Sequence, residues 1–142
     1  MLQVNDLIMY GGVGLGKIES VKDIQFSDIT QKFYVLQFKN NLKINISESE
    51  LNTKSNLRKI CDKDTLAQAE AIMADTSLKS TGKNWNQKQR EYHNKINSGD
   101  ILEIAFVVAC LKNKPALSFG EKNILETSMA LIQEETRLVL NQ

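Results

Sequence analysis

The chain has 142 residues, of which 42% are hydrophobic and 25% are charged, and its formal net charge at pH 7 is +1. This length accommodates one ordinary domain or two small ones, and the composition is that of a globular protein rather than a disordered one. A net charge so close to zero excludes strong non-specific binding of nucleic acid by the protein as a whole, because such binding depends on neutralising many phosphates.

Residues 1 to about 55 contain short apolar or alternating runs that are typical of β-strands. These runs are Leu7–Tyr10, Lys17–Val21, Phe33–Phe38 and Leu42–Ile46. Turn-forming residues separate them: glycines after the first run, Ser27-Asp28 after the second, and Asn40-Asn41 before the fourth. Asparagine tolerates the positive φ of a tight turn. The pattern predicts a small antiparallel β unit that is curled into a barrel.

The glycine-rich segment from Gly11 to Lys17 fits the GxxxxGK part of a phosphate-binding loop. Ile18 follows it, at the position where that motif needs the hydroxyl group of Ser or Thr for a magnesium ion. The chain then continues as a strand, where a helix should receive the phosphates. We therefore interpret the segment as a glycine-rich β-turn and predict no nucleotide cofactor.

From about residue 56 the apolar period changes from two to near 3.6, which predicts helices. The first predicted helix begins at an aspartate cap, either Asp62 or Asp64. The second begins after Asn84 and ends at Ser98-Gly99, with Tyr92 and Ile96 on its apolar face. The apolar stripe of the first helix consists of Leu66, Ala69, Ile72 and Met73.

Two further helix starts are marked by an acid three residues after a capping residue, in the pairs Asp100/Glu103 and Ser118/Glu121. The helix Ile101–Lys112 is apolar nearly all round, which predicts that it is the buried centre of a bundle. The last helix is predicted from Phe119 to about Leu140. The sequence thus predicts an α+β fold, with a β-barrel domain over residues 1–55 and an all-α helical bundle over residues 56–142.

Several classes of function are disfavoured by what the chain lacks. The apolar run Ile104–Leu111 is far shorter than the roughly 20 residues of a membrane span, and the first residues do not resemble a signal peptide, so we expect a cytoplasmic protein. Cys61 and Cys110 stand far apart and His93 is the only histidine, so we predict no metal site and two inert thiols. Glu134-Glu135 is interpreted as a solvated helix end, and no enzyme activity is predicted.

A basic segment surrounds the only tryptophan, Trp85, which starts the second predicted helix. The segment has a local net charge of +4, because the single acid Glu91 accompanies Lys79, Lys83, Lys88, Arg90 and Lys95. Two interpretations are open. Trp85 either fixes the helix to the bundle, or it acts as a wedge whose flat ring contacts exposed bases while the neighbouring cations hold phosphates.

Motifs in the helical half occur in a specific order and spacing: Asn84-Trp85, Ser98-Gly99-Asp100, Val107-Val108 and Leu117-Ser118-Phe119-Gly120-Glu121-Lys122. This order resembles the CarD family of bacterial RNA polymerase-binding regulators, also called CdnL. Segments 2–10 and 33–46 are similar to the N-terminal barrel of that family, a Tudor-like module also found in transcription-repair coupling factors. The resemblance covers nearly the whole chain.

The resemblance implies a barrel that binds the β subunit of RNA polymerase and a helical domain that contacts promoter DNA at the upstream edge of the melted bubble. Trp85 would be the wedge, and Lys88, Arg90 and Lys122 match basic positions of the family. The residues expected to bind DNA are Trp85, Lys83, Lys88, Arg90 and Lys122. The implied polymerase-binding residues are Val21, Lys22, Tyr34, Lys43 and Asn45. Relatives carry basic residues where this chain has Val21, Asn45 and Gln87, so fewer charge-assisted contacts are expected.

The implied function is that of a non-catalytic transcription regulator that stabilises the open promoter complex. It would work as a monomer, without cofactors or membrane contact, in the cytoplasm and on the nucleoid through RNA polymerase. The alternative is a protein-interaction adaptor of the same fold that makes no DNA contact and keeps Trp85 in its core.

Overall fold

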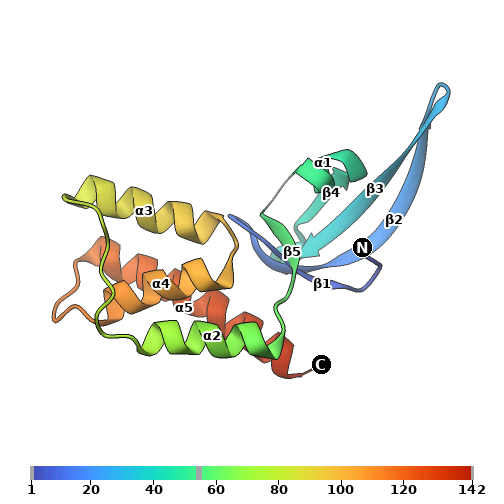
Figure 1. Cartoon of the computed structure of the whole chain (residues 1–142). Helices are drawn as coiled ribbons and strands as arrows, with labels where there is room; N and C mark the ends of the chain where they lie inside the picture. The colour runs from blue at the N-terminus through green and yellow to red at the C-terminus, as the bar shows by residue number, and fades with distance from the viewer. Residues whose placement is uncertain (1, 54–55, 142) are drawn as a thin grey trace.

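The computed structural model describes residues 2–53 and 56–141, and it confirms the α+β layout (Figure 1). Strands come first, with one short helix among them, and four longer helices follow. The strands are β1 (Leu7–Tyr10), β2 (Gly14–Phe26), β3 (Ile29–Phe38), β4 (Lys43–Ser47) and β5 (Leu57–Lys59). The helices are α1 (Glu48–Thr53), α2 (Lys63–Ala74), α3 (Trp85–Asn97), α4 (Ile101–Lys112) and α5 (Phe119–Leu140).

All five strands belong to one antiparallel sheet, in the order β4-β3-β2-β1-β5. The two outer strands, β4 and β5, are not paired with each other within the described part of the chain, so the predicted closure into a barrel is not found. One physical reason is visible in Figure 1: β2 and β3 continue beyond their neighbours as a long two-stranded hairpin that extends away from the body. A second is that α1 follows β4 and packs on β3 and β4.

The turns between strands lie where the sequence predicts them. Ser27, between β2 and β3, has a φ of 53°, and Asn41, in the short 3-10 turn Lys39–Asn41 before β4, has a φ of 61°. The segment Gly11 to Lys17 contains a turn and the first residues of β2, and Lys17 pairs with Leu7. This confirms the β-turn interpretation, because no helix follows the glycines.

Successive side chains of a strand point to opposite faces of the sheet. Met9 and Leu15, on one face, belong to the core that is shared with the helices, and the opposite face has a core of its own. Its buried members are Ile8, Tyr10, Ile18, Tyr34, Leu36, Phe38 and Ile46. The helical half is built around α4, which contacts α2, α3 and α5. The consecutive residues 107–111 of α4 point in different directions around the helix and are each at most 4% exposed. The predicted central helix is therefore confirmed.

The predicted helix caps are also present. Asp62, Asn84, Asp100 and Ser118 each accept a hydrogen bond from a backbone N–H in the first turn of the following helix. At α5 the reciprocal bond from Ser118 N–H to the Glu121 side chain completes the capping box. At α4 the predicted box is not formed, because Asp100 accepts from the Leu102 N–H and not from the Glu103 N–H, and the Glu103 carboxylate pairs with Lys95 at 2.6 Å.

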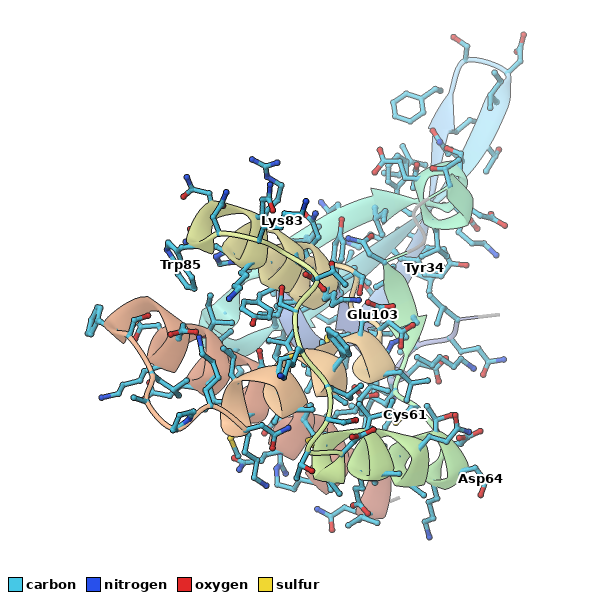
Figure 2. The ribbon with its side chains drawn as sticks, turned by 60° about the vertical axis from the view of Figure 1, so that its left-hand side comes forward. Tyr34, Cys61, Asp64, Lys83, Trp85 and Glu103 are labelled. Atoms are coloured by element: carbon cyan, nitrogen blue, oxygen red, sulfur yellow. The ribbon has the colours of Figure 1, made fainter. Side chains whose placement is uncertain are left out.

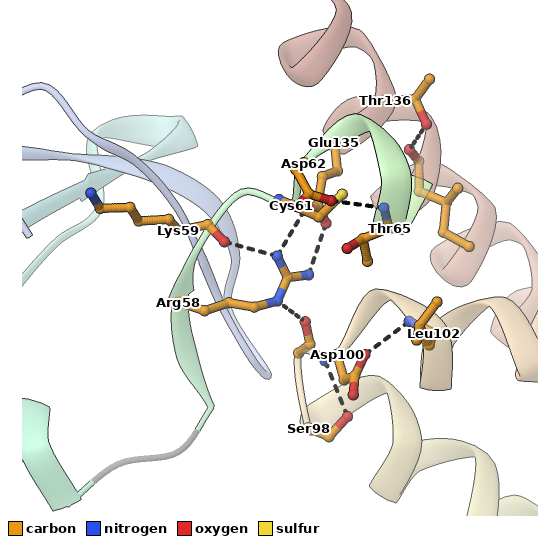
Figure 3. A network of polar contacts seen from close by, with 12 residues as sticks. Arg58, Lys59, Cys61, Asp62, Thr65, Ser98, Asp100, Leu102, Glu135 and Thr136 are labelled. Carbon is orange, nitrogen blue, oxygen red and sulfur yellow. Dashed lines mark hydrogen bonds and ion pairs between the residues drawn. The ribbon is translucent and has the colours of Figure 1, made fainter. Parts of the chain in front are cut away.

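A buried ion pair connects the sheet to the helices (Figure 3). The guanidinium of Arg58, on β5, donates two hydrogen bonds of 2.7 and 2.9 Å to the carboxylate of Glu135, on α5. Glu135 is 0% exposed and also accepts the Cys61 N–H at 2.7 Å. The interpretation of Glu135 as solvated is therefore wrong. Its position relative to Ile132 and Val139 explains why, since residues spaced by three and four share one helix face.

The same connection contains a close backbone approach. Arg58 Nε donates to the carbonyl oxygen of Gly99 at 2.8 Å, which holds the α3–α4 turn against β5. A Cβ atom at Gly11 would lie only 2.1 Å from the carbonyl oxygen of Asn97, so this position admits no side chain. We call the contacts of Gly11, Arg58, Asn97, Gly99 and Glu135 the seam. It fixes the sheet relative to the helices.

Candidate functional site

The start of α3, where Trp85 lies, is shaped by hydrogen bonds in the turn before it. Asn84 Oδ1 accepts from Gln87 N–H at 3.0 Å, and Gln87 Oε1 accepts from Lys83 N–H at 2.8 Å. Gln87 therefore holds the turn from which Lys83 and Trp85 project at the same end of α3, as Figure 2 shows. This gives a structural reason for an uncharged residue at position 87.

The single acid of the basic segment, Glu91, has a structural role as a hydrogen-bond acceptor. Its Oε2 accepts hydrogen bonds from Ser80 Oγ at 2.6 Å, Thr81 N–H at 3.0 Å and Thr81 Oγ1 at 3.2 Å. Burial raises the pKa of Glu91. These hydrogen bonds and the charge of Lys95 have the larger, opposite effect, so the pKa lies below its usual value. The carboxylate thus ties the loop before α3 to the middle of the helix.

The Trp85 ring is packed on one side and open on another. A Cβ atom at Gly120 would lie 3.1 Å from Cζ2 of the ring, so the indole rests against the first turn of α5. The residue is nevertheless 39% exposed, which places it among the large apolar side chains at the surface. Both interpretations of Trp85 therefore stay predictions. The indole is not sealed inside the bundle.

The predicted DNA-binding set contains four cations, of which Lys88 lines a hollow with Trp85, and Arg90 lines another hollow farther along α3 with Glu91 and Glu103. Lys83, Arg90 and Lys122 are exposed and Lys88 is half-buried. None of the four forms an ion pair with a residue in the described ranges 2–53 and 56–141. We call Trp85 together with Lys83, Lys88, Arg90 and Lys122 the basic end of the helical domain. Its cations remain available to phosphates.

Two other lysines in this region are already neutralised. Lys95 pairs with Glu103 and also lies 4.7 Å from the centre of the Phe106 ring. Lys114 pairs with Glu121, a residue that is only 5% exposed. Burial raises the pKa of Glu121, but the bonds from Lys114 and Ser118 outweigh it and lower the pKa overall. Glu121 therefore does not repel an anion at the basic end.

The predicted polymerase-binding residues fall on two faces of the sheet. Lys22, Lys43 and Asn45 are exposed on one face, and β4, which carries the last two, is an edge strand. Val21 and Tyr34 pair with each other on the opposite face. Tyr34 is 3% exposed and belongs to the core of the sheet, so its side chain presents nothing to a partner. We therefore reassign Tyr34 to packing.

One exposed aromatic residue was not assigned a role from the sequence. Phe119, the first residue of α5, is 81% exposed and directly precedes Gly120, against which Trp85 rests. A signal was present, because side chains tilt toward the start of their helix. An aromatic residue immediately after the cap therefore points past the helix end rather than into the bundle.

The described residues 2–53 and 56–141 contain no group of three or more His, Cys, Asp or Glu side chains that could hold a metal ion. None of their helices combines the length and the apolar character that crossing a membrane requires. Burial raises the pKa of Cys110 to about 11 and that of half-buried Cys61 to about 12. Both thiols are therefore protonated at neutral pH, which makes them poor nucleophiles.

Comparison with known proteins divides the chain at nearly the same place as the fold does. Residues 2–61 match the family model of the CarD-like/TRCF RID domain, and residues 68–142 match that of the CarD C-terminal domain. A protein of Bacillus subtilis (strain 168), named "Putative transcription factor YdeB", is 29% identical over 147 residues, covering 98% of this chain and 92% of the relative.

Proposed function

The chain belongs to the CarD family, whose members are transcription-related proteins, and from that premise we propose that it binds the β subunit of RNA polymerase and stabilises the open promoter complex. The observation that carries the proposal is the basic end of the helical domain. It combines a partly exposed indole with four cations that form no ion pair within the described residues, on a molecule whose other half exposes Lys22, Lys43 and Asn45 on one face of the sheet.

The basic end is suited to DNA but cannot select promoters alone. Four phosphate contacts give a slope of about −4 in a log-log plot of affinity against salt concentration, so free binding is weak at physiological salt. An aromatic ring can lean on a base only where stacking is disturbed, as it is at the edge of a melted bubble. The contact therefore favours opened DNA over closed duplex and shifts the opening equilibrium without catalysis.

The sheet supplies the second contact in this proposal. Lys22 offers positive charge on the exposed face, where Lys43 is paired with Glu19 at 3.2 Å. β4 is an edge strand, and within the described residues no further strand pairs with its outer side, so it could pair with a strand of another chain. Binding to polymerase makes the DNA contact intramolecular, at an effective concentration of up to about the millimolar range. The proposed role places the protein on the nucleoid in the cytoplasm.

Trp85→Ala is the test of the DNA contact. We expect the variant to bind polymerase as the wild type does but to shorten the lifetime of open promoter complexes by about fivefold to 100-fold, the range that stacking one base on an aromatic ring provides. The lifetime is measured by challenging complexes formed with the same organism's polymerase with heparin. Equal lifetimes with mutant and wild-type protein would refute the wedge.

Charge reversal on the sheet tests the polymerase contact. The double variant Lys22→Glu/Lys43→Glu should bind the polymerase β subunit about tenfold or more weakly, because two cations facing an acidic surface become repulsive. Lys63→Glu is the matched control, since Lys63 is an exposed lysine of the helical half without an ion pair among the described residues. Affinity is measured by biolayer interferometry. Unchanged affinity of the double variant would show that polymerase is bound through another surface.

A protein-interaction adaptor of the same fold is the alternative function, and one observation favours it. The tip of the β2–β3 hairpin exposes large apolar residues, with Phe26 56% and Ile29 69% exposed. Exposed apolar groups of this kind suit contacts between proteins. An adaptor would bind other proteins and make no DNA contact, so Trp85→Ala would not change the lifetime of open complexes, and the first experiment separates the two functions.

A further inference from the structure

Phe119 has an exposure that the fold does not explain. Among the large apolar side chains of the described residues it is the most exposed, at 81%, against 39% for Trp85 and 58% for Leu140. It is the first residue of α5, directly after the cap Ser118. The core contacts of this end of α5 come from Ile124 and Leu125, so no packing contact requires an aromatic ring at position 119.

Phe119 directly precedes the residue that Trp85 contacts. The indole lies against Gly120, where a Cβ atom would be 3.1 Å from Cζ2, and Gly120 is the residue that follows Phe119. Trp85, Lys88 and Lys114 line one hollow between the starts of α3 and α5, together with Ser118 and Glu121. Two aromatic rings from different helices therefore share one end of the domain.

The charges around the two rings favour an anionic ligand over an apolar surface of another protein. Lys122 lies one turn after Phe119, at the i to i+3 spacing that makes residues neighbours on a helix, and it is exposed and unpaired within the described ranges. The acid that lines the hollow, Glu121, is buried and paired with Lys114. Flat rings surrounded by cations are the combination that binds unpaired nucleotides.

We propose that Phe119 is a second base-stacking residue, which contacts an unpaired base of the melted promoter next to the one that Trp85 contacts. This inference rests on the proposed function and adds a subsite to it. Lys122 holds the phosphate beside the stacked base, and the two rings together distinguish strand-separated DNA from duplex, in which bases are stacked on one another and offer no free face.

The test compares four variants of the full-length protein in open complexes formed with the same organism's polymerase. Phe119→Ala and Phe119→Leu should each shorten the complex lifetime by about fivefold or more, the lower end of the effect of one stacked base. Phe119→Tyr keeps the ring and should keep the wild-type lifetime. Leu140→Ala, which removes an exposed apolar side chain at the other end of α5, is the matched control and should change nothing.

The outcomes distinguish this inference from the proposed function. A shortened lifetime with Trp85→Ala and a wild-type lifetime with Phe119→Ala would overturn the second subsite and leave the proposed function standing. Wild-type lifetimes with both would overturn both. A wild-type lifetime with Phe119→Leu would show an apolar contact that needs no ring, which also overturns stacking. Equal melting temperatures of all variants confirm that each is folded, as expected for a side chain so exposed.

Discussion

Arg58→Ala is expected to lower the free energy of unfolding by about 3 to 5 kcal/mol, because it leaves a carboxylate without its counter-ion inside the protein. Glu135 is 0% exposed, and its oxygens receive two hydrogen bonds from Arg58 and one from the Cys61 backbone. Without the guanidinium, Glu135 keeps hydrogen bonds only from uncharged groups, the Cys61 N–H and the Cys61 thiol. The variant also loses the bond from Arg58 to the Gly99 carbonyl oxygen.

Urea unfolding followed by circular dichroism measures this effect, and the neighbouring ion pair supplies the control. Glu134 pairs with Arg137 at 2.8 Å, but it lies at the surface, and Arg137→Ala should therefore unfold close to the wild-type midpoint. The double variant Arg58→Met/Glu135→Leu should recover part of the loss, since it removes both charges together. Equal midpoints for Arg58→Ala and Arg137→Ala would contradict the buried pair.

Gly11→Ala is expected to destabilise the protein by about 3 kcal/mol, the upper part of the range for an extra methyl group in a packed interior. The new Cβ would meet the Asn97 carbonyl oxygen at 2.1 Å and the Gly99 backbone nitrogen at 2.9 Å. Both are backbone atoms, so neither can rotate away as a side chain would. The sheet and the helices must separate, or the turn after β1 must move.

Val13→Ala is the control for Gly11→Ala, because Val13 lies in the same turn but is 42% exposed. It should leave the unfolding midpoint nearly unchanged, since exposed substitutions away from such contacts usually cost less than about 0.5 kcal/mol. The measurement is again urea unfolding. A wild-type midpoint for Gly11→Ala would mean that the seam is more open in solution.

Local rules were sufficient to predict much of the fold. The caps Asn84 and Ser118 and the buried character of α4 could be read from neighbouring residues, because a cap depends on amides within three residues and burial on the apolar period. Whether the sheet closes into a barrel could not be predicted from neighbouring residues, since closure depends on the number of residues over which β2 and β3 pair. The strand β5 is three residues long, too short for a recognisable pattern.

The candidate site was predictable in its charged and aromatic residues but not in their partners. Trp85 and the surrounding cations stand out in a short basic segment, whereas the neutralisation of Lys95 by Glu103 depends on how α3 and α4 cross. Glu135 and Tyr34 could have been placed from periodicity, because each shares a face with buried apolar neighbours on its own element. The seam requires contacts between distant segments, which a local pattern does not contain.

The seam has a consequence for how tightly two partners can be joined. A flexible tether between two binding surfaces would leave the helical half free to tumble, and docking it on DNA would then cost the entropy of stopping that motion. Here the ion pair and the touching glycines stop it when the polypeptide folds. The rings at the far end of the helices are thus already oriented with respect to the sheet. The rotational freedom that DNA binding would otherwise remove has therefore been lost before DNA arrives.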